Sequence, residues 1–154
     1  MKIEKDYEEL LRLFNKNSAK YCIIGSYAVA FYAKPRYTKD MDILIDPTIE
    51  NGKRIANALK EFGFESLNLS EKDFCQPGII VQLGYEPLRI DIMTSIQGCS
   101  FEKVWENKIV GTYGHEEVFF IGLDELIENK KQSDRQQDKD DLDILFAARQ
   151  KKSK

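Results

Sequence analysis

The chain has 154 residues, of which 42% are hydrophobic and 32% charged, and its formal net charge is −3. This fits one domain with its own hydrophobic core, and no run approaches the ~18 apolar residues that a membrane-spanning helix needs. The charged N-terminal segment, Lys2-Ile3-Glu4-Lys5-Asp6, is unlike a signal peptide. The negative net charge excludes binding of duplex nucleic acid through bulk positive charge.

Hydrophobic periodicity and turn residues divide the chain into alternating helices and strands. Tyr7, Leu10 and Phe14, for example, recur at helical spacing. Thr48 suits the N-cap of a helix that Gly63 ends. The predicted segments are helices over 4–16, 27–32, about 49–62, 101–107, 123–131 and 136–149, and strands over 21–24, 41–45, 79–83, 88–93, 109–110 and 118–121.

The remaining segments are predicted to be connections. Residues 34–38 form a loop, residues 66–77 are irregular, and residues 150–154 are a frayed tail. A glycine-containing connection between 110 and 118 indicates an antiparallel hairpin. We therefore predict a single domain over residues 1–154, of α/β (α+β) class, with a small mixed β-sheet flanked by helices.

Cysteine and histidine are too few for several common kinds of site. Cys22, Cys75 and Cys99 are far apart and include no CxxC pair, which excludes a disulfide framework and a cysteine zinc site. Reducing cytosol is the simplest compartment, so a cytoplasmic protein is expected. The single histidine, His115, excludes any mechanism that needs two, and its surroundings indicate an ordinary turn residue.

Two aspartates open the strand predicted near residue 41. Successive strand side chains point to opposite faces, so Asp40 and Asp42 project the same way while Met41 and Ile43 face the other way. Two neighbouring carboxylates repel each other, and a divalent cation such as Mg²⁺ relieves the repulsion because it prefers oxygen ligands. Taken alone, the D-x-D pattern is also consistent with two solvated aspartates at a strand end.

A third aspartate lies in the strand predicted over 88–93. Leu88, Ile90 and Ile92 alternate and make the core face, so Asp91 points the opposite way. If this strand lies beside 41–45, three carboxylates converge, an arrangement suited to two Mg²⁺ ions and a triphosphate. The alternative is a single edge-strand aspartate beside Arg89.

Two further segments are candidate anion sites. Gly25 and Ser26 join a strand to a helix, where free backbone N–H groups and the Ser26 hydroxyl can bind phosphate. A plain strand-to-helix turn capped by Ser26 is the alternative. Arg36 precedes the aspartates, and its guanidinium fork suits phosphate or carboxylate, although a solvated loop arginine would look the same.

Together these segments resemble the minimal prokaryotic branch of the nucleotidyltransferase superfamily with the polymerase-β-like fold. The pattern G-S-x-A appears at residues 25–28, R-x-T-x-D-x-D at 36–42, and the third aspartate is Asp91. The closing patterns L-I-x-x-K and R-x-x-D-x-x-D-L appear at residues 126–130 and 135–142. The resemblance covers about residues 20–146.

The resemblance implies transfer of a nucleoside monophosphate from an NTP to an acceptor hydroxyl, with release of pyrophosphate. Mg²⁺, or Mn²⁺ in its place, would be the cofactor, and Asp91 the best candidate for general base. Asp138 and Asp141 would orient Lys130 or Arg135 instead of binding metal, although a charged, solvated helix pair is an equal interpretation of this region. The implied catalytic and metal residues are Asp40, Asp42 and Asp91, and the implied nucleotide-binding residues are Gly25, Ser26, Arg36, Thr38 and Lys130.

The branch includes toxins of toxin–antitoxin and abortive-infection systems. The acceptor is open: an RNA 3′ end, a protein hydroxyl or a small molecule such as an aminoglycoside. No membrane partner is expected, and a second copy or a partner chain is a candidate to complete the cleft. The alternative function is a non-catalytic nucleotide-binding or antitoxin module. A triad of buried carboxylates without a catalytic role would lower the stability of the protein, which argues against this alternative.

Overall fold

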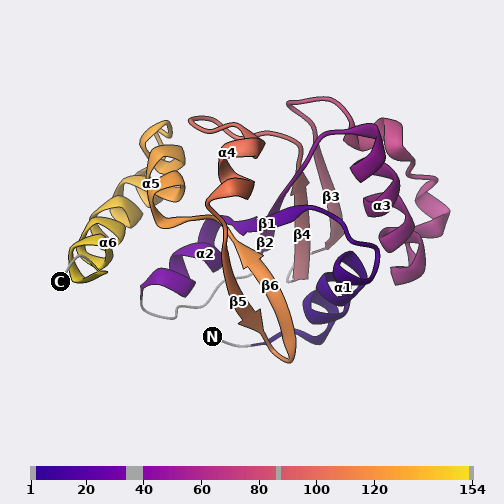
Figure 1. Cartoon of the computed structure of the whole chain (residues 1–154), viewed down its shortest axis with the longest axis horizontal. Coiled ribbons are helices and arrows are strands. Elements are labelled where there is room, and N and C mark those ends of the chain that lie inside the picture. Colours follow the sequence, from indigo (N-terminus) through magenta and orange to yellow (C-terminus); the bar gives the residue numbers. More distant parts are fainter. Residues whose placement is uncertain (1–2, 34–39, 86–87, 153–154) are drawn as a thin grey trace.

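The computed structural model of the chain describes residues 3–33, 40–85 and 88–152. Arg36 and Thr38 lie outside these ranges, so the structure does not place them. The described residues form one six-stranded sheet with helices around it (Figure 1). The strands are β1 (Tyr21–Ile24), β2 (Asp40–Ile45), β3 (Ile80–Tyr85), β4 (Leu88–Met93), β5 (Ile109–Tyr113) and β6 (Glu116–Phe120). The helices are α1 (Lys5–Lys16), α2 (Gly25–Tyr32), α3 (Ile49–Leu59), α4 (Phe101–Glu106), α5 (Leu123–Lys131) and α6 (Gln136–Lys152).

The sheet is mixed, as the sequence predicts, with strand order β3-β4-β2-β1-β6-β5. The pairs β1–β2, β3–β4 and β5–β6 are antiparallel, which confirms the predicted hairpin, and His115 lies in its turn. The pairs β2–β4 and β1–β6 are parallel. Because β4 lies between β2 and β3, Asp91 is in an interior strand and not in an edge strand.

The core forms where the predicted apolar faces meet. Leu10 and Phe14 of α1 and Met41 and Ile43 of β2 are each fully shielded from solvent. Burying side chains of this size stabilises the fold by about 1.5–3 kcal/mol each. Thr48 caps α3 as predicted, since its hydroxyl accepts a hydrogen bond of 3.2 Å from the backbone N–H of Asn51.

Several element boundaries differ from the predictions. The helix α2 begins at Gly25, directly after β1. After α3 ends at Leu59, a π-helical turn follows over Lys60–Phe64, and Gly63 breaks it with a φ of 119°. The segment predicted as irregular contains short 3-10 helices, at Glu65–Leu67 and Glu71–Phe74. At the other end of the chain, residues 150–152 continue α6, whereas a frayed tail was predicted.

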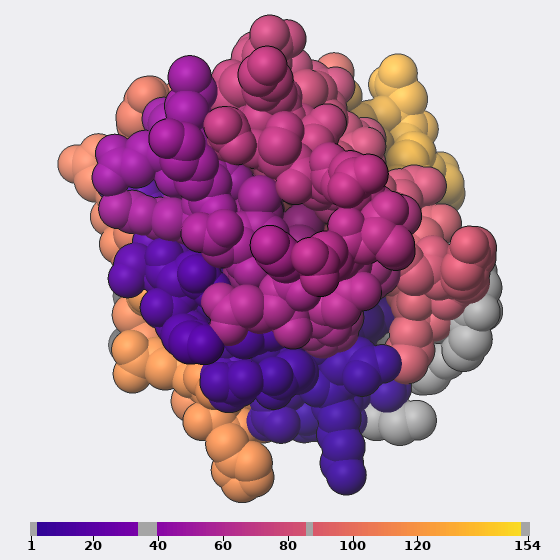
Figure 2. All heavy atoms as spheres, turned by 90° about the vertical axis from the view of Figure 1, so that its right-hand side faces the viewer, coloured from indigo at the N-terminus to yellow at the C-terminus, as the bar shows by residue number. Residues whose placement is uncertain are grey.

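Helices lie on both sides of the sheet (Figure 1). In that view α1 and α3 are on the right, and α2, α5 and α6 are on the left. Figure 2 looks onto the side formed by α1, α3 and the segment that follows α3. No helix in the described ranges is long and apolar enough to cross a membrane. The three cysteines are free, with Cys22 buried in β1.

Candidate active site

The acidic residues meet through the parallel pairing of β2 with β4. Asp42 lies directly opposite Asp91, and Asp40 lies directly opposite Arg89. Residues two apart in a strand share a face, so all four side chains lie on one face of the sheet. The sequence predicted that three carboxylates converge if these two strands are neighbours, and the two strands are neighbours.

Arg89 bridges two of the three carboxylates. Its Nη2 atom lies 3.0 Å from Oδ2 of Asp40, and its Nε atom lies 3.1 Å from Oδ1 of Asp91. The Tyr7 hydroxyl of α1 donates a 3.1 Å hydrogen bond to the backbone oxygen of Arg89. Sequence reasoning treated Arg89 only as a neighbour of Asp91, although the R-x-D spacing within a strand already places both side chains on one face.

Asp42 is the carboxylate whose ionisation the site perturbs most clearly. Burial and the negative charges of Asp91 and Asp40 raise its pKa, Lys130 and Arg89 partly offset the rise, and the net pKa is about 6. Asp91 is itself buried, and Oδ1 of Asp40 is a buried oxygen that has no hydrogen-bond partner in the structure as described. The site therefore concentrates negative charge that its own cations do not fully neutralise.

Gly25 is required by its position against Asp42. Ile24, the residue before it, pairs with Asp42 across β1 and β2, so α2 starts beside that carboxylate. Gly25 has a φ of +67°, and a Cβ atom there would collide with Oδ2 of Asp42. The glycine thus allows the start of α2, with its backbone N–H groups, to approach the acidic residues closely.

Lys130 is held in place by the two aspartates that the sequence assigned to that role. Its Nζ atom lies 2.7 Å from Oδ1 of Asp138 and 3.2 Å from Oδ2 of Asp141, and all three residues are buried. Burial raises the pKa of Asp138, but hydrogen bonds from Lys130 and Ser133 outweigh it, so the net shift is downward. These contacts agree with an orienting role for Asp138 and Asp141.

A cleft of about 290 Å³ lies between the start of α2, the strand β2 and the helix α5. Gly25, Asp42 and Lys130 line it, together with polar residues that sequence reasoning had not assigned to a site. Those residues come from the segment after β4 and from the α5–α6 connection, and no local motif marks them. They are Ser95, Gln97, Asn129 and Ser133.

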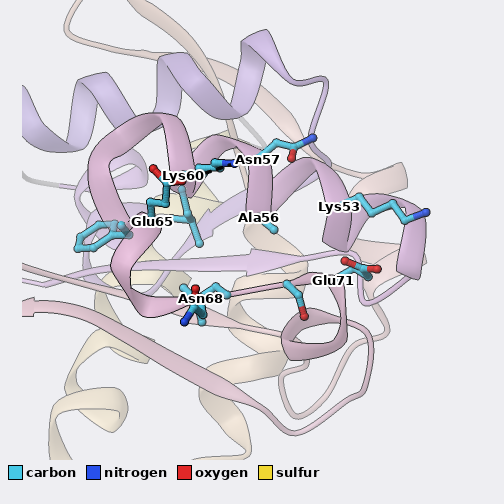
Figure 3. A pocket seen from close by; sticks show the side chains of 11 residues that line it. Lys53, Ala56, Asn57, Lys60, Glu65, Asn68 and Glu71 are labelled. Atoms are coloured by element: carbon cyan, nitrogen blue, oxygen red, sulfur yellow. Dashed lines mark ion pairs between the residues drawn. The ribbon is translucent and has the colours of Figure 1, made fainter.

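A second hollow, of about 350 Å³, lies beside α3 (Figures 2 and 3). Its labelled lining residues include two lysines and two glutamates: Lys53, Lys60, Glu65 and Glu71. Lys60 pairs with Glu65 at 3.7 Å, so opposite charges already neutralise each other here. Because Asp42 lines the other cleft and pairs directly with Asp91, we assign the candidate active site there.

The donor chemistry of the acidic cleft suits divalent cations. Three carboxylates share one sheet face, one of their oxygens is buried with no hydrogen-bond partner among the described residues, and burial together with the neighbouring negative charges raises the pKa of Asp42. Across the described ranges, no three His, Cys, Asp or Glu side chains are already grouped as a metal site. The chemical nature of these residues therefore suits divalent cations. In this structure Arg89 lies between two of the three carboxylates, those of Asp40 and Asp91.

Solved structures with this fold include several nucleotidyltransferases. A lincosamide antibiotic adenylyltransferase, LnuA, has a TM-score of 0.56 at 15% identity, covering 94% of this chain and 97% of that one. The antibiotic-resistance factor ANT(2'')-Ia gives 0.56 at 11%, covering 94% and 82%. An antigenic nucleotidyltransferase-like protein from Paracoccidioides brasiliensis gives 0.50 at 11%, covering 92% and 75%. The chain therefore shares its fold with these proteins, which confirms the predicted fold class.

The sequence places the chain more narrowly within that class. Residues 3–154 match the family described as nucleotidyl transferase of unknown function (DUF2204), and the chain belongs to this family. The superfamily suggested by the sequence motifs is thereby confirmed. A comparison with curated proteins found no match.

Proposed function

We propose that this protein transfers a nucleoside monophosphate from an NTP to an acceptor hydroxyl and releases pyrophosphate, with Mg²⁺ or Mn²⁺ as cofactor. The observation that carries the proposal is the β2–β4 register, which sets Asp42 opposite Asp91 and Asp40 on the same face. Membership of a nucleotidyl transferase family supports it. So does the cleft that begins at Asp42 and extends to Lys130.

The three aspartates would hold the divalent ions. When bound, Mg²⁺ would neutralise phosphate charge and lower the pKa of the acceptor hydroxyl. Asp91 is the candidate general base, because it is buried directly opposite Asp42. Asp40 offers a buried oxygen that has no hydrogen-bond partner among the described residues, which suits a ligand role.

The triphosphate would bind between α2 and α5. Gly25 and Ser26 supply backbone N–H groups at the start of α2. An ammonium group has three N–H donors, and Asp138 and Asp141 engage two of those of Lys130, so a third can reach a phosphate oxygen in the cleft. Arg36 and Thr38 remain candidates for the same role on the family motif alone.

The acceptor would approach over β3. With the nucleotide on the α2 and α5 side, the strand on the other side of Asp91 is the edge strand β3, where the exposed residue Gln82 pairs directly with it. The structural neighbours named for lincosamides and antibiotic resistance make hydroxylated small molecules one acceptor class to test. An RNA 3′ end and a protein hydroxyl are the others.

The test is a transfer assay with NTPs labelled on the α- or the γ-phosphate. The protein is incubated with Mg²⁺, each NTP and each acceptor class, and label on the acceptor is measured. We expect transfer of α-label and not of γ-label, abolished in Asp42→Asn and retained in Asp140→Asn, whose exposed side chain bonds only Gln136 in the described structure. Full activity of Asp42→Asn would contradict the proposal, and Mg²⁺-dependent NTP binding without transfer would favour a non-catalytic module.

A further inference from the structure

The guanidinium of Arg89 occupies the space between two proposed metal ligands. Besides its 3.0 Å contact with Asp40, it meets Asp91 through two parallel N–H donors, Nε to Oδ1 at 3.1 Å and Nη2 to Oδ2 at 3.3 Å. This is a fork that engages both oxygens of one carboxylate. Arginine stays charged at all physiological pH values, so the bridge persists wherever the aspartates are ionised.

The backbone around Arg89 is held by strand pairing, whereas its side chain is partly exposed to solvent. The strand β4 is paired on both sides, and the Tyr7 hydroxyl holds the backbone oxygen of Arg89. The residue opposite Arg89 on the β3 side is Gly84, which has no side chain on the shared face. The side chain of Arg89 is 30% exposed, so it can leave Asp40 by turning toward β3.

A divalent ion and this guanidinium compete for the same position. Both are attracted to Oδ2 of Asp40 and to the oxygens of Asp91, and two cations held a few ångströms apart repel each other. The competition is strongest at Asp40, because its other oxygen, Oδ1, is buried and has no hydrogen-bond partner among the described residues.

We propose that Arg89 is a resident counter-cation of the acidic triad. It bridges Asp40 and Asp91 in the metal-free protein, and it leaves Asp40 toward Gly84 when a divalent ion binds. Arg89 is thus a positioning residue that stabilises the metal-free site and lowers its affinity for metal. This inference rests on the proposed function, because it takes the aspartates to be the metal ligands.

The test is binding of Mn²⁺ alone, measured by calorimetry, combined with thermal unfolding in EDTA. Arg89→Gln should bind Mn²⁺ about tenfold more tightly than the wild type, because the competing charge is gone, and should melt at a lower temperature without metal. The matched control is Arg12→Gln, since Arg12 forms the same fork on an exposed carboxylate, that of Glu9. This control should leave Mn²⁺ affinity unchanged.

A second variant keeps the test decisive if Arg89→Gln does not fold. Arg89→Lys retains the charge but cannot form the fork, so its Mn²⁺ affinity should lie between those of wild type and the glutamine variant. In ¹⁵N spectra of the wild type, titration with Mg²⁺ should shift the Nε–H signal of Arg89. A static bridge would leave that signal in place and would overturn the proposal.

The experiments distinguish a failure of the counter-cation role from a failure of the proposed metal site. If Asp42→Asn abolishes Mn²⁺ binding but Arg89→Gln, or Arg89→Lys in its place, binds Mn²⁺ no more tightly than wild type, the counter-cation role is wrong and the metal site stands. If Asp42→Asn binds Mn²⁺ as the wild type does, the aspartates are not the metal ligands. That result would overturn the proposed function together with this inference.

Discussion

Asp42 links the chemistry of the site to the stability of the protein. Burial, together with Asp91 and Asp40, raises its pKa from 3.8 to about 6 in the folded state. An acid with a raised folded pKa costs no stability below its unfolded pKa, since both states are then protonated. The cost grows between about pH 4 and pH 6 and stays constant above, where it is on the order of 2–3 kcal/mol.

We therefore predict that Asp42→Asn stabilises the metal-free protein at neutral pH. Asparagine does not ionise, so the variant should gain about 2 kcal/mol in free energy of unfolding at pH 7.5 and close to nothing at pH 4. Urea denaturation in EDTA measures both values, with the exposed Asp140→Asn as control. An equal gain at the two pH values would show that the cause is not ionisation.

The same pKa predicts how metal binding depends on pH. A protonated carboxyl group is a poor metal ligand, so Mn²⁺ affinity should fall by about tenfold per pH unit below about pH 6. Calorimetric titrations at pH 7.5 and pH 5 provide the comparison. Affinity that stays constant over this range would mean that Asp42 does not bind the metal.

Gly25 offers a separate test of how closely α2 must approach the site. Gly25→Ala should destabilise the protein by about 1–3 kcal/mol and abolish NTP binding, since the added methyl group collides with Asp42 at a positive φ. Gly78→Ala is the matched control, because Gly78 has a φ of +80° but open space at its Cβ position. If both variants lose equal stability and both bind NTP, backbone strain alone explains the loss and the close approach does not matter.

Among the elements, α5 and α6 are joined by the buried ion pairs of Lys130. Asp141 is fully shielded from solvent, and its Oδ2 atom lies 3.2 Å from the Lys130 ammonium. Removing one partner of a buried charged pair is expensive, because the other charge is left without compensation. This connection also positions the lysine at the cleft.

Asp141→Asn should lower the free energy of unfolding by about 2–4 kcal/mol. Asp140→Asn, one residue away but exposed, should change it by less than about 0.5 kcal/mol. Chemical denaturation at neutral pH measures both. A similar small change in the two variants would show that the Lys130 pairs do not hold the two helices together.

Most helices and strands of this fold could be predicted from the sequence. Features that depend on contacts between residues distant in the sequence could not. Alternation placed Asp40 and Asp42 on one face, and helical spacing placed Asp138 beside Asp141, since both patterns are local. The parallel pairing of β2 with β4, and hence the bridge by Arg89, depends on strands that are distant in sequence. The 3-10 turn over Glu71–Phe74 was missed although Ser70 and Asp73 form a local capping box there, and the burial of Phe74 that accompanies it is a tertiary contact.

At the scale of the whole molecule, the sheet carries the acidic residues and the helices supply the groups that face them. Asp42 and Asp91 lie in the interior of the sheet and are paired with a neighbouring strand on both sides, and Asp40 is paired with Arg89 of β4. The cleft draws on β1, β2, α2, the end of β4, α5 and α6. Binding of metal and nucleotide together should therefore stabilise the whole fold and raise its melting temperature.

The most direct test of the central claim is calorimetric titration of each of the four NTPs into wild type and Asp42→Asn, with Mg²⁺ and with EDTA. We predict that at least one NTP binds the wild type only when Mg²⁺ is present, and that Asp42→Asn loses this binding. Equal NTP affinity in the two proteins, or binding that is indifferent to Mg²⁺, would contradict the assignment of the acidic sheet face as a metal–triphosphate site.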